Sequence, residues 1–257
     1  PYRGMALTTE FEFLLDGWSD DADDYPLTYT YGYRQQRRTK RTASGYKPEQ
    51  LVPLVADQYA SAWFVTTLPQ AKNVNVSCVG RTFDRYLSYA EVQQPARVDE
   101  LVISTEDLTE LADDLLSSSL DTSDGEASLS LISNVASVLG ATPKSVNGSE
   151  VEKTPEELAA ETALIDNLFA ATLSAATLVG TGTSAAATTQ VLSTVSTLSA
   201  NPEALSEDSQ TGALDLLDNV VGGSAETGID PDAAASTAAA VSSLLDASLF
   251  SAPAEGE

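Results

Sequence analysis

Two triplets in this sequence match the acceptor pattern for N-linked glycosylation, in which a serine or threonine stands two positions after an asparagine. They are Asn75-Val76-Ser77 and Asn147-Gly148-Ser149. Asn75 alternates with two valines, so it should lie on the solvent face of a strand. Asn147 falls in a loop between predicted helices. We therefore predict glycosylation at Asn75 and Asn147, and the Ser/Thr-rich loops also permit O-linked glycans.

Positive charge is concentrated in the segment 34–47, which contains Arg34, Arg37, Arg38, Lys40, Arg41 and Lys47. Such a run is compatible with a nucleic-acid or heparin site, with a solvated hairpin loop, or with a contact to an acidic protein. The chain has a net charge of −25, which repels polyanions and argues against nucleic acid as a partner. Among the functional alternatives, the sequence favours a protein contact made by Arg34, Arg37, Arg38, Lys40 and Arg41, for example with the acidic half of another copy.

Four aspartates in the segment 20–24 raise the possibility of calcium binding. An EF-hand loop starting at Asp20 would need glycine at its sixth position and glutamate at its twelfth, where this chain has Tyr25 and Tyr31. A looser, weak calcium site stays open, but a solvated acidic turn before Pro26 is favoured. We expect no cofactor.

The residues needed for common catalytic sites are missing. The chain has no histidine, which excludes Ser-His-Asp and Cys-His catalysis and histidine-ligated metals. Its single cysteine, Cys78, is expected to be a buried free thiol or to pair outside this segment. An enzyme that uses carboxylates alone, such as a glycosidase pair, is a remote alternative because nothing places two acids across a pocket. We therefore predict that the chain is not an enzyme.

Charge and aromatic residues divide the chain of 257 residues into two unlike halves. Residues 1–100 hold 11 of the 13 basic residues and 15 of the 17 aromatic residues, whereas residues 101–257 hold 25 of the 38 acidic residues. This contrast predicts two domains, 1–103 and 104–257. No uninterrupted apolar run approaches the roughly 18 residues of a membrane-spanning helix, so we expect no membrane insertion by this segment.

The first half has the alternation of β-strands. Phe11 and Phe13 alternate with acids, and aromatic residues alternate with small or polar ones over 27–34. Further strands are expected at 63–68, at 74–78, near 87–92 and at 98–103. Several short, aromatic-rich antiparallel strands in about 100 residues indicate a β-sandwich of fibronectin or immunoglobulin type.

The second half has the spacing of amphipathic helices, and we expect an acidic bundle of about six short α-helices. Ser104 can cap a helix whose apolar residues run from 108 to 120. The next apolar stripe, 131–139, can stop at Gly140. The sequence Thr154-Pro155-Glu156-Glu157 is a strong helix start, and that helix should end near Gly180. Later stripes lie at 191–198 and 214–221, and Asp230-Pro231 opens the last helix. The fold class is therefore α+β, in two domains.

Four motifs of the N-terminal half stand out: the stretch 4–11, the turn Gly17-Trp18-Ser19-Asp20, the segment 26–31 that opens with Pro26-Leu27, and Leu68-Pro69. Together they resemble the receptor-for-egg-jelly (REJ) region of polycystin-type surface proteins. The family usually has a cysteine before the Gly-Trp turn, where this chain has Leu14 and Leu15, so the partner that the resemblance implies for Cys78 is missing. Trp18 is expected to be an aromatic anchor of the sandwich and Pro26 to end the turn.

The helical half resembles the helical subdomain of a GAIN domain, and the segment 205–217 has its leucine, serine-glutamine, leucine pattern. A complete GAIN domain adds a β-subdomain with a histidine-containing cleavage site, which this histidine-free chain does not hold. The low-lysine, alanine-rich composition resembles that of algal or halophile proteins. Because the sequence begins at Pro1 without a signal peptide, we expect it to be a segment of a larger surface protein whose parent chain can be membrane-anchored.

The resemblance implies a non-catalytic, extracellular structural or interaction module of a large polycystin-like glycoprotein. A location on a cilium or flagellum, in a surface filament such as a mastigoneme, is one version of it. The expected partners are other surface glycoproteins or copies of the chain. The alternative function is a regulatory ectodomain segment of a polycystin-like receptor or channel, which would support a GAIN cleavage site further along the parent chain.

Overall fold

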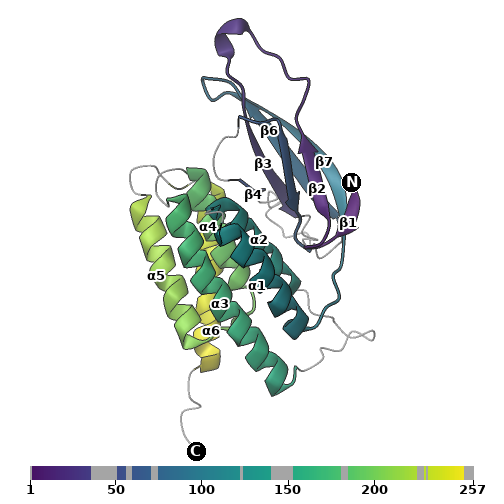
Figure 1. Ribbon diagram of the computed structural model, residues 1–257. Helices are drawn as coiled ribbons and strands as arrows, with labels where there is room; N and C mark the ends of the chain where they lie inside the picture. The colour runs from purple at the N-terminus through teal and green to yellow at the C-terminus, as the bar shows by residue number, and fades with distance from the viewer. Residues whose placement is uncertain are drawn as a thin grey trace, which may run out of the picture.

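The computed structural model describes residues 2–35, 51–55, 60–70, 75–121, 124–139, 153–180, 185–224, 229 and 231–251. A strand-rich N-terminal part stands at one end of a helical C-terminal part (Figure 1). This arrangement confirms the predicted α+β class. The last strand ends at Asp99 and the first helix begins at Thr105, while the domain boundary at 103/104 stays a prediction.

Seven strands form two sheets in the described part of the chain. They are β1 (Arg3–Met5), β2 (Glu10–Leu14), β3 (Thr28–Gln35), β4 (Leu51–Pro53), β5 (Trp63–Thr67), β6 (Asn75–Phe83) and β7 (Tyr89–Asp99). The larger sheet has the order β1-β7-β6-β3-β4, and the smaller sheet pairs β2 with β5. All pairs are antiparallel except β1 with β7. The order β7-β6-β3 against β2-β5 is that of fibronectin- and immunoglobulin-like sandwiches.

Aromatic rings fill the space between the two sheets. Tyr31 of β3 stacks on Phe64 of β5 with ring centroids 5.1 Å apart, and Phe13 of β2 meets Tyr31 edge-on at 5.8 Å. The alternation in the sequence produces this core, because Phe11, Phe13, Tyr31 and Tyr33 are all buried while their neighbours point outward. The prediction of the sandwich from alternation is confirmed by these contacts.

The strand prediction for the segment after residue 87 was wrong in one respect. We expected two strands, 87–92 and 98–103, but β7 is one continuous strand from Tyr89 to Asp99, and residues 101–104 are not in a strand. Pro95 does not interrupt the strand. Arg97, two residues further on, donates its backbone N–H to Tyr2, on the side away from β6. The nitrogen of Pro95 faces the same side, so the proline removes no hydrogen bond between β7 and β6.

Six α-helices of 14 to 25 residues follow in the described residues after 104. They are α1 (Thr105–Asp121), α2 (Gly125–Leu139), α3 (Pro155–Val179), α4 (Ala185–Leu198), α5 (Glu207–Gly223) and α6 (Pro231–Ser251). Short 3₁₀ turns η1 (Ala22–Asp24) and η2 (Pro202–Ala204) precede β3 and α5. The expected helix starts hold: Ser104 accepts from the N–H of Asp107, and Thr154 with Glu157 forms a full capping box. Gly180 ends α3 in the left-handed conformation.

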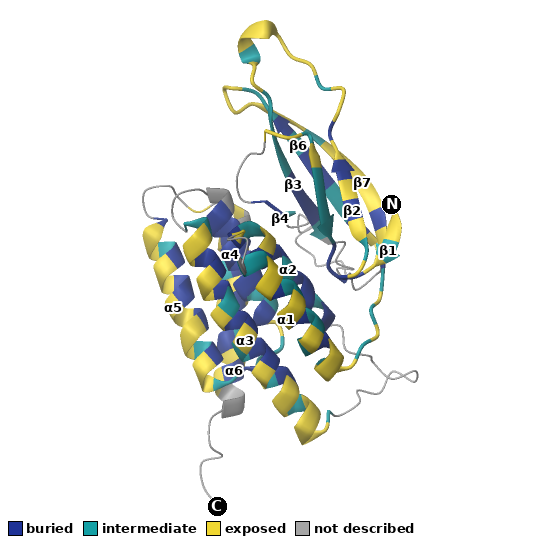
Figure 2. Cartoon of the chain, viewed as in Figure 1, coloured by how far each residue is buried: buried dark blue, intermediate teal, exposed yellow. Residues whose placement is uncertain are grey.

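Helix α4 lies inside the bundle, and its polar residues are buried together with its apolar ones. Thr188, Gln190 and Thr194 are each at most 2% exposed. Thr194 and Ser133 of α2 share a hydrogen bond of 2.9 Å, and Thr188 and Ser224 share one of 3.3 Å. The small hydroxyl side chains thus link α4 to its neighbours from within the core. Figure 2 shows α4 largely in the colour of buried residues.

Helix α3 requires an amendment to the expectation about membrane segments. By length and composition it is apolar enough to cross a membrane, with a mean hydropathy of 1.4 over its most apolar 18 residues. A core helix passes the same test. Here α3 buries Glu161, which is paired with Lys153, and packs Leu164, Leu168 and Phe169 into the core, while 39% of its most apolar window is buried.

Candidate functional site

Two of the predicted site residues, Arg34 on β3 and Asn75 on β6, lie on the outer face of the five-stranded sheet. Tyr31 and Tyr33 point into the sandwich, so Arg34 points outward. Register then places Ser77 opposite Arg34, Arg81 opposite Glu91, and Asn75 opposite Arg97. We call this the outer sheet face: the outward residues of β1, β7, β6, β3 and β4.

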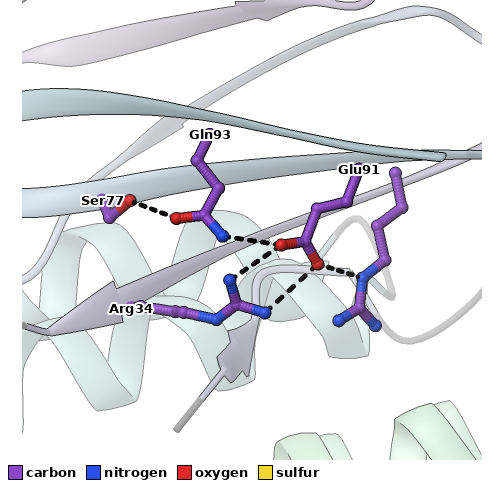
Figure 3. Close-up of polar contacts among 5 residues, drawn as sticks. Arg34, Ser77, Glu91 and Gln93 are labelled. Atoms are coloured by element: carbon purple, nitrogen blue, oxygen red, sulfur yellow. Dashed lines mark hydrogen bonds and ion pairs between the residues drawn. The ribbon is translucent and has the colours of Figure 1, made fainter. Parts of the chain in front are cut away.

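Glu91 of β7 is the centre of a polar network across three strands of this face (Figure 3). Arg34 binds the carboxylate through two nitrogens, at 2.8 and 3.2 Å, and Arg81 Nε donates to it at 2.9 Å. The amide of Gln93 donates to Glu91 at 2.7 Å, and Ser77 donates to Gln93 at 3.3 Å. The Arg34 and Glu91 side chains are only 18% and 20% exposed.

The network fixes the charge state of Glu91. Burial by itself raises the pKa of Glu91, but hydrogen bonds from Arg34, Gln93 and Arg81 outweigh it and lower the pKa to about 2. Glu91 is therefore ionised at neutral pH and has no proton to donate. Arg81 also lies 4.9 Å above the centre of the Tyr89 ring, which extends the network to the edge of the face.

A second charged cluster lies where β1 joins the sheet. Arg3 and Arg97 each donate through Nε to Asp99, at 2.6 and 2.7 Å. Hydrogen bonds from Arg97 and Arg3 lower the pKa of Asp99. The side chains of Arg3 and Arg97 are 67% and 51% exposed, respectively, whereas that of Arg34 is 18% exposed. The described outer sheet face thus has four arginines against two carboxylates, in a chain whose net charge is −25.

Asn75 is the first residue of β6 and is exposed, as its alternation predicted. The structure therefore leaves its side-chain amide open to solvent on the outer sheet face. The second predicted acceptor, Asn147, lies outside the described residues, as do Arg37, Arg38, Lys40 and Arg41 of the basic segment. Arg34 belongs to the Glu91 network, and the protein contact predicted for the segment stays a prediction.

The other predicted residues lie away from this face. Trp18 is half-buried and packs against the core, in keeping with an anchoring role, while Pro26 is exposed after a cis peptide bond with Tyr25. In the acidic turn, partial burial and the nearby carboxylates of Asp20 and Asp21 raise the pKa of Asp24. Among the described residues, no group of three or more acidic, cysteine or histidine side chains is arranged to hold a metal ion.

The residues that sequence reasoning missed are Glu91, Arg81, Arg97, Asp99 and Arg3. Their signal was available in part, because Glu91, Gln93, Arg97 and Asp99 stand at odd positions of one strand and so share a face. Their partners on β3 and β1 depend on strand pairing across 57 and 96 residues, which alternation alone does not give.

A second polar region joins the sandwich to the helices. Ser130 of α2 donates to the carbonyl of Leu54 at 2.8 Å, and Asn134 donates to the carbonyl of Thr67 at 3.1 Å. Gln190 of α4 donates to Leu54 and to Ser130, at 3.4 and 3.1 Å. We call these contacts the junction. Asn134 and Gln190 are 1% and 2% exposed, so the junction is buried.

A cavity of about 250 Å³ lies beside the junction, between β5 and the start of α2. Leu54, Phe64, Thr67, Asp124, Ser130 and Leu131 are among the residues that line it. Neither this cavity nor the outer sheet face brings together a nucleophile, a base and an oxyanion site in the described residues. What the outer sheet face offers is a fixed, solvent-facing set of hydrogen-bonding groups.

Comparison with protein families decides the identity of the sandwich. The family model of the REJ domain matches residues 1–134, slightly more than half of the chain. The chain belongs to the REJ-domain family. The REJ domain is an extracellular module of polycystin-like surface proteins, so an extracellular location holds for this chain. No curated protein and no solved structure matches it.

The REJ match ends within α2, and not at the end of the sandwich. It includes all of α1 and reaches Asn134, the residue that bonds the carbonyl of Thr67 on β5. The matched region therefore contains both sides of a junction contact.

Proposed function

We propose that this REJ chain is a non-catalytic structural module of a large polycystin-like surface glycoprotein, and that it acts as a rigid spacer or docking platform. The observation that carries the proposal is the junction. Because Ser130, Asn134 and Gln190 bond backbone carbonyls of the sandwich, the helices and the sandwich cannot turn against each other without breaking buried hydrogen bonds.

A ciliary or flagellar surface filament, such as a mastigoneme, is the setting that suits such a spacer. Its partners there would be other surface glycoproteins or further copies of the chain. The chain would need no cofactor and catalyse no reaction in this role. Ionised, paired carboxylates such as Glu91 and Asp99 support this, because each is held by two arginines.

The experiment is immunogold electron microscopy on intact, unpermeabilised cells with an antibody against residues 104–257. Label spaced along external filaments supports the structural proposal. Label confined to the plasma or ciliary membrane contradicts the filament role, and label that appears only after permeabilisation contradicts the surface role altogether.

A further inference from the structure

Part of the outer sheet face is exposed to solvent. From Tyr89 to Pro95, β7 exposes most of its residues, including Gln93 and Pro95 on this face. The four arginines of this face are already paired with its two carboxylates, and the groups left exposed include Gln93 and the half-exposed Arg97. An uncharged, hydroxyl-rich ligand suits these donors and acceptors.

We propose that Asn75 carries an N-linked glycan and that the first sugars of this glycan lie on the outer sheet face. The proposal rests on the extracellular role proposed above, since N-glycans are added to secreted chains. It goes beyond the predicted acceptor triplet by assigning the sugars of Asn75 a position on this face.

The placement of Asn75 carries the first step. Asn75 is exposed, and its register partner on β7 is Arg97. Ser77, which completes the acceptor triplet, is the next outward residue of β6 and stands opposite Pro95. Residues two apart on a strand are separated by about 7 Å, and paired residues by about 5 Å, so a glycan root at Asn75 has Ser77, Pro95 and Arg97 within one sugar's reach.

The chemistry of these neighbours carries the second step. The Arg97 guanidinium uses Nε for Asp99 and is half exposed, so its outer nitrogens can donate to sugar hydroxyls. Gln93 is exposed and accepts from Ser77. Pro95 offers a small apolar surface to the C–H face of a sugar ring. Because the glycan is tethered at Asn75, these contacts need little affinity each to be occupied.

The test uses the full chain secreted from eukaryotic cells behind an added signal peptide. Glycopeptide mass spectrometry should find Asn75 occupied. Asn75→Gln removes the acceptor residue and leaves the Ser77–Gln93 bond in place, and it should lower the Tm by about 2–4 °C. Ser77→Thr keeps the triplet and should retain both glycan and Tm. Ser149→Ala removes the triplet of Asn147 and is the matched control. It should leave both the glycan at Asn75 and the Tm unchanged.

Enzymatic treatment of the folded wild-type protein gives a second measurement that needs no variant to fold. Complete removal of the glycan should increase hydrogen exchange of the amides in β6 and β7, whereas trimming to the first sugar should leave most of the protection.

An unoccupied Asn75 in secreted, folded protein overturns this inference and leaves the proposed function standing. Occupancy without any change in Tm or exchange on removal overturns the contact with the face. Failure of the native protein to reach the cell surface would instead overturn the proposed function.

Discussion

Glu91 is the residue on which the outer sheet face depends most. Replacement by glutamine keeps the shape but removes the charge that Arg34 and Arg81 share. We expect Glu91→Gln to lower the free energy of unfolding at pH 7 by about 1–3 kcal/mol, because two half-buried arginines lose a charged acceptor. Chemical denaturation of both proteins at pH 7 measures this difference.

The same variant tests the pKa of Glu91. Its folded-state pKa is lowered to about 2 from the usual value near 4.5, so its ionised form stabilises the fold above pH 4.5. This stabilisation is lost as the pH falls from about 4.5 to about 2. Wild-type protein should therefore lose more stability over that range than Glu91→Gln. Glu10→Gln, at an exposed position of β2, is the control and should behave as wild type. Equal acid sensitivity of the wild-type and Glu91→Gln proteins would contradict the network.

Cys78 should be a slow nucleophile in the folded protein. Burial raises the pKa of its thiol to about 11, so the thiolate at pH 8 is roughly 100-fold rarer than for a thiol of pKa 9. An aromatic disulfide reagent should accordingly label Cys78 about 100-fold more slowly in native than in denatured protein. Rapid labelling of the native protein, followed by absorbance, would show that the thiol is open and available for an external partner.

For single residues, the sequence predicted on which face of a strand a residue lies, but not which residue it bonds. Alternation placed Asn75 and Arg34 outward, since the period of two follows from backbone geometry. It could not assign Arg34 to Glu91, because that pair depends on which strands become neighbours. Arg34 therefore looked like one of six equivalent cations, although the structure ties it into the sheet.

Two glycines in the helices offer a comparison at the scale of elements. A side chain at Gly125, where α2 starts, would come within 2.7 Å of the Ala175 carbonyl on α3. A side chain at Gly212 of α5 would meet nothing within 4 Å. We expect Gly125→Ala to destabilise the protein by about 1–3 kcal/mol through overpacking, and Gly212→Ala to stabilise it by up to about 1 kcal/mol.

Thermal and chemical unfolding of the two variants measures the contrast. Both replacements add one methyl group to a helix, so helix propensity alone predicts the same sign for both. A stabilising Gly125→Ala would mean that α2 and α3 are packed less closely at that point than their contact indicates.

The elements that the sequence predicted best are those with local signals. The capping box at Thr154, the cap at Ser104 and the glycine at 180 mark helix ends without reference to the rest of the chain. The strands β1 and β4 were missed because each has three residues and exists through its pairing, with Arg97–Asp99 and Gly32–Arg34 respectively. The burial of polar residues in α4 was also missed, since hydroxyls satisfied by neighbouring helices look like a solvent face in the sequence.

For the whole molecule, the junction sets how the two halves relate. Composition predicted a boundary at 103/104, but it contained no signal for contacts across that boundary. The buried core runs from Phe13 and Leu54 of the sandwich to Leu129 and Leu192 of the helices without interruption. The sandwich and the bundle should consequently depend on each other for stability.

We therefore expect calorimetry of the chain to show one cooperative unfolding transition. Asn134→Ala removes the hydrogen bonds that α2 donates to the Thr67 carbonyl and hydroxyl in a buried place, and it should lower the free energy of unfolding by about 1–3 kcal/mol. Asn167→Ala, at an exposed position of α3, is the matched control and should change the free energy of unfolding by less than about 0.5 kcal/mol.

Two resolved transitions in the wild-type protein would mean that the halves unfold separately, and a spacer role would then need rigidity from another source. A single transition that Asn134→Ala splits or broadens would place the mechanical coupling in the junction itself, because that variant removes the hydrogen bonds from Asn134 to Thr67.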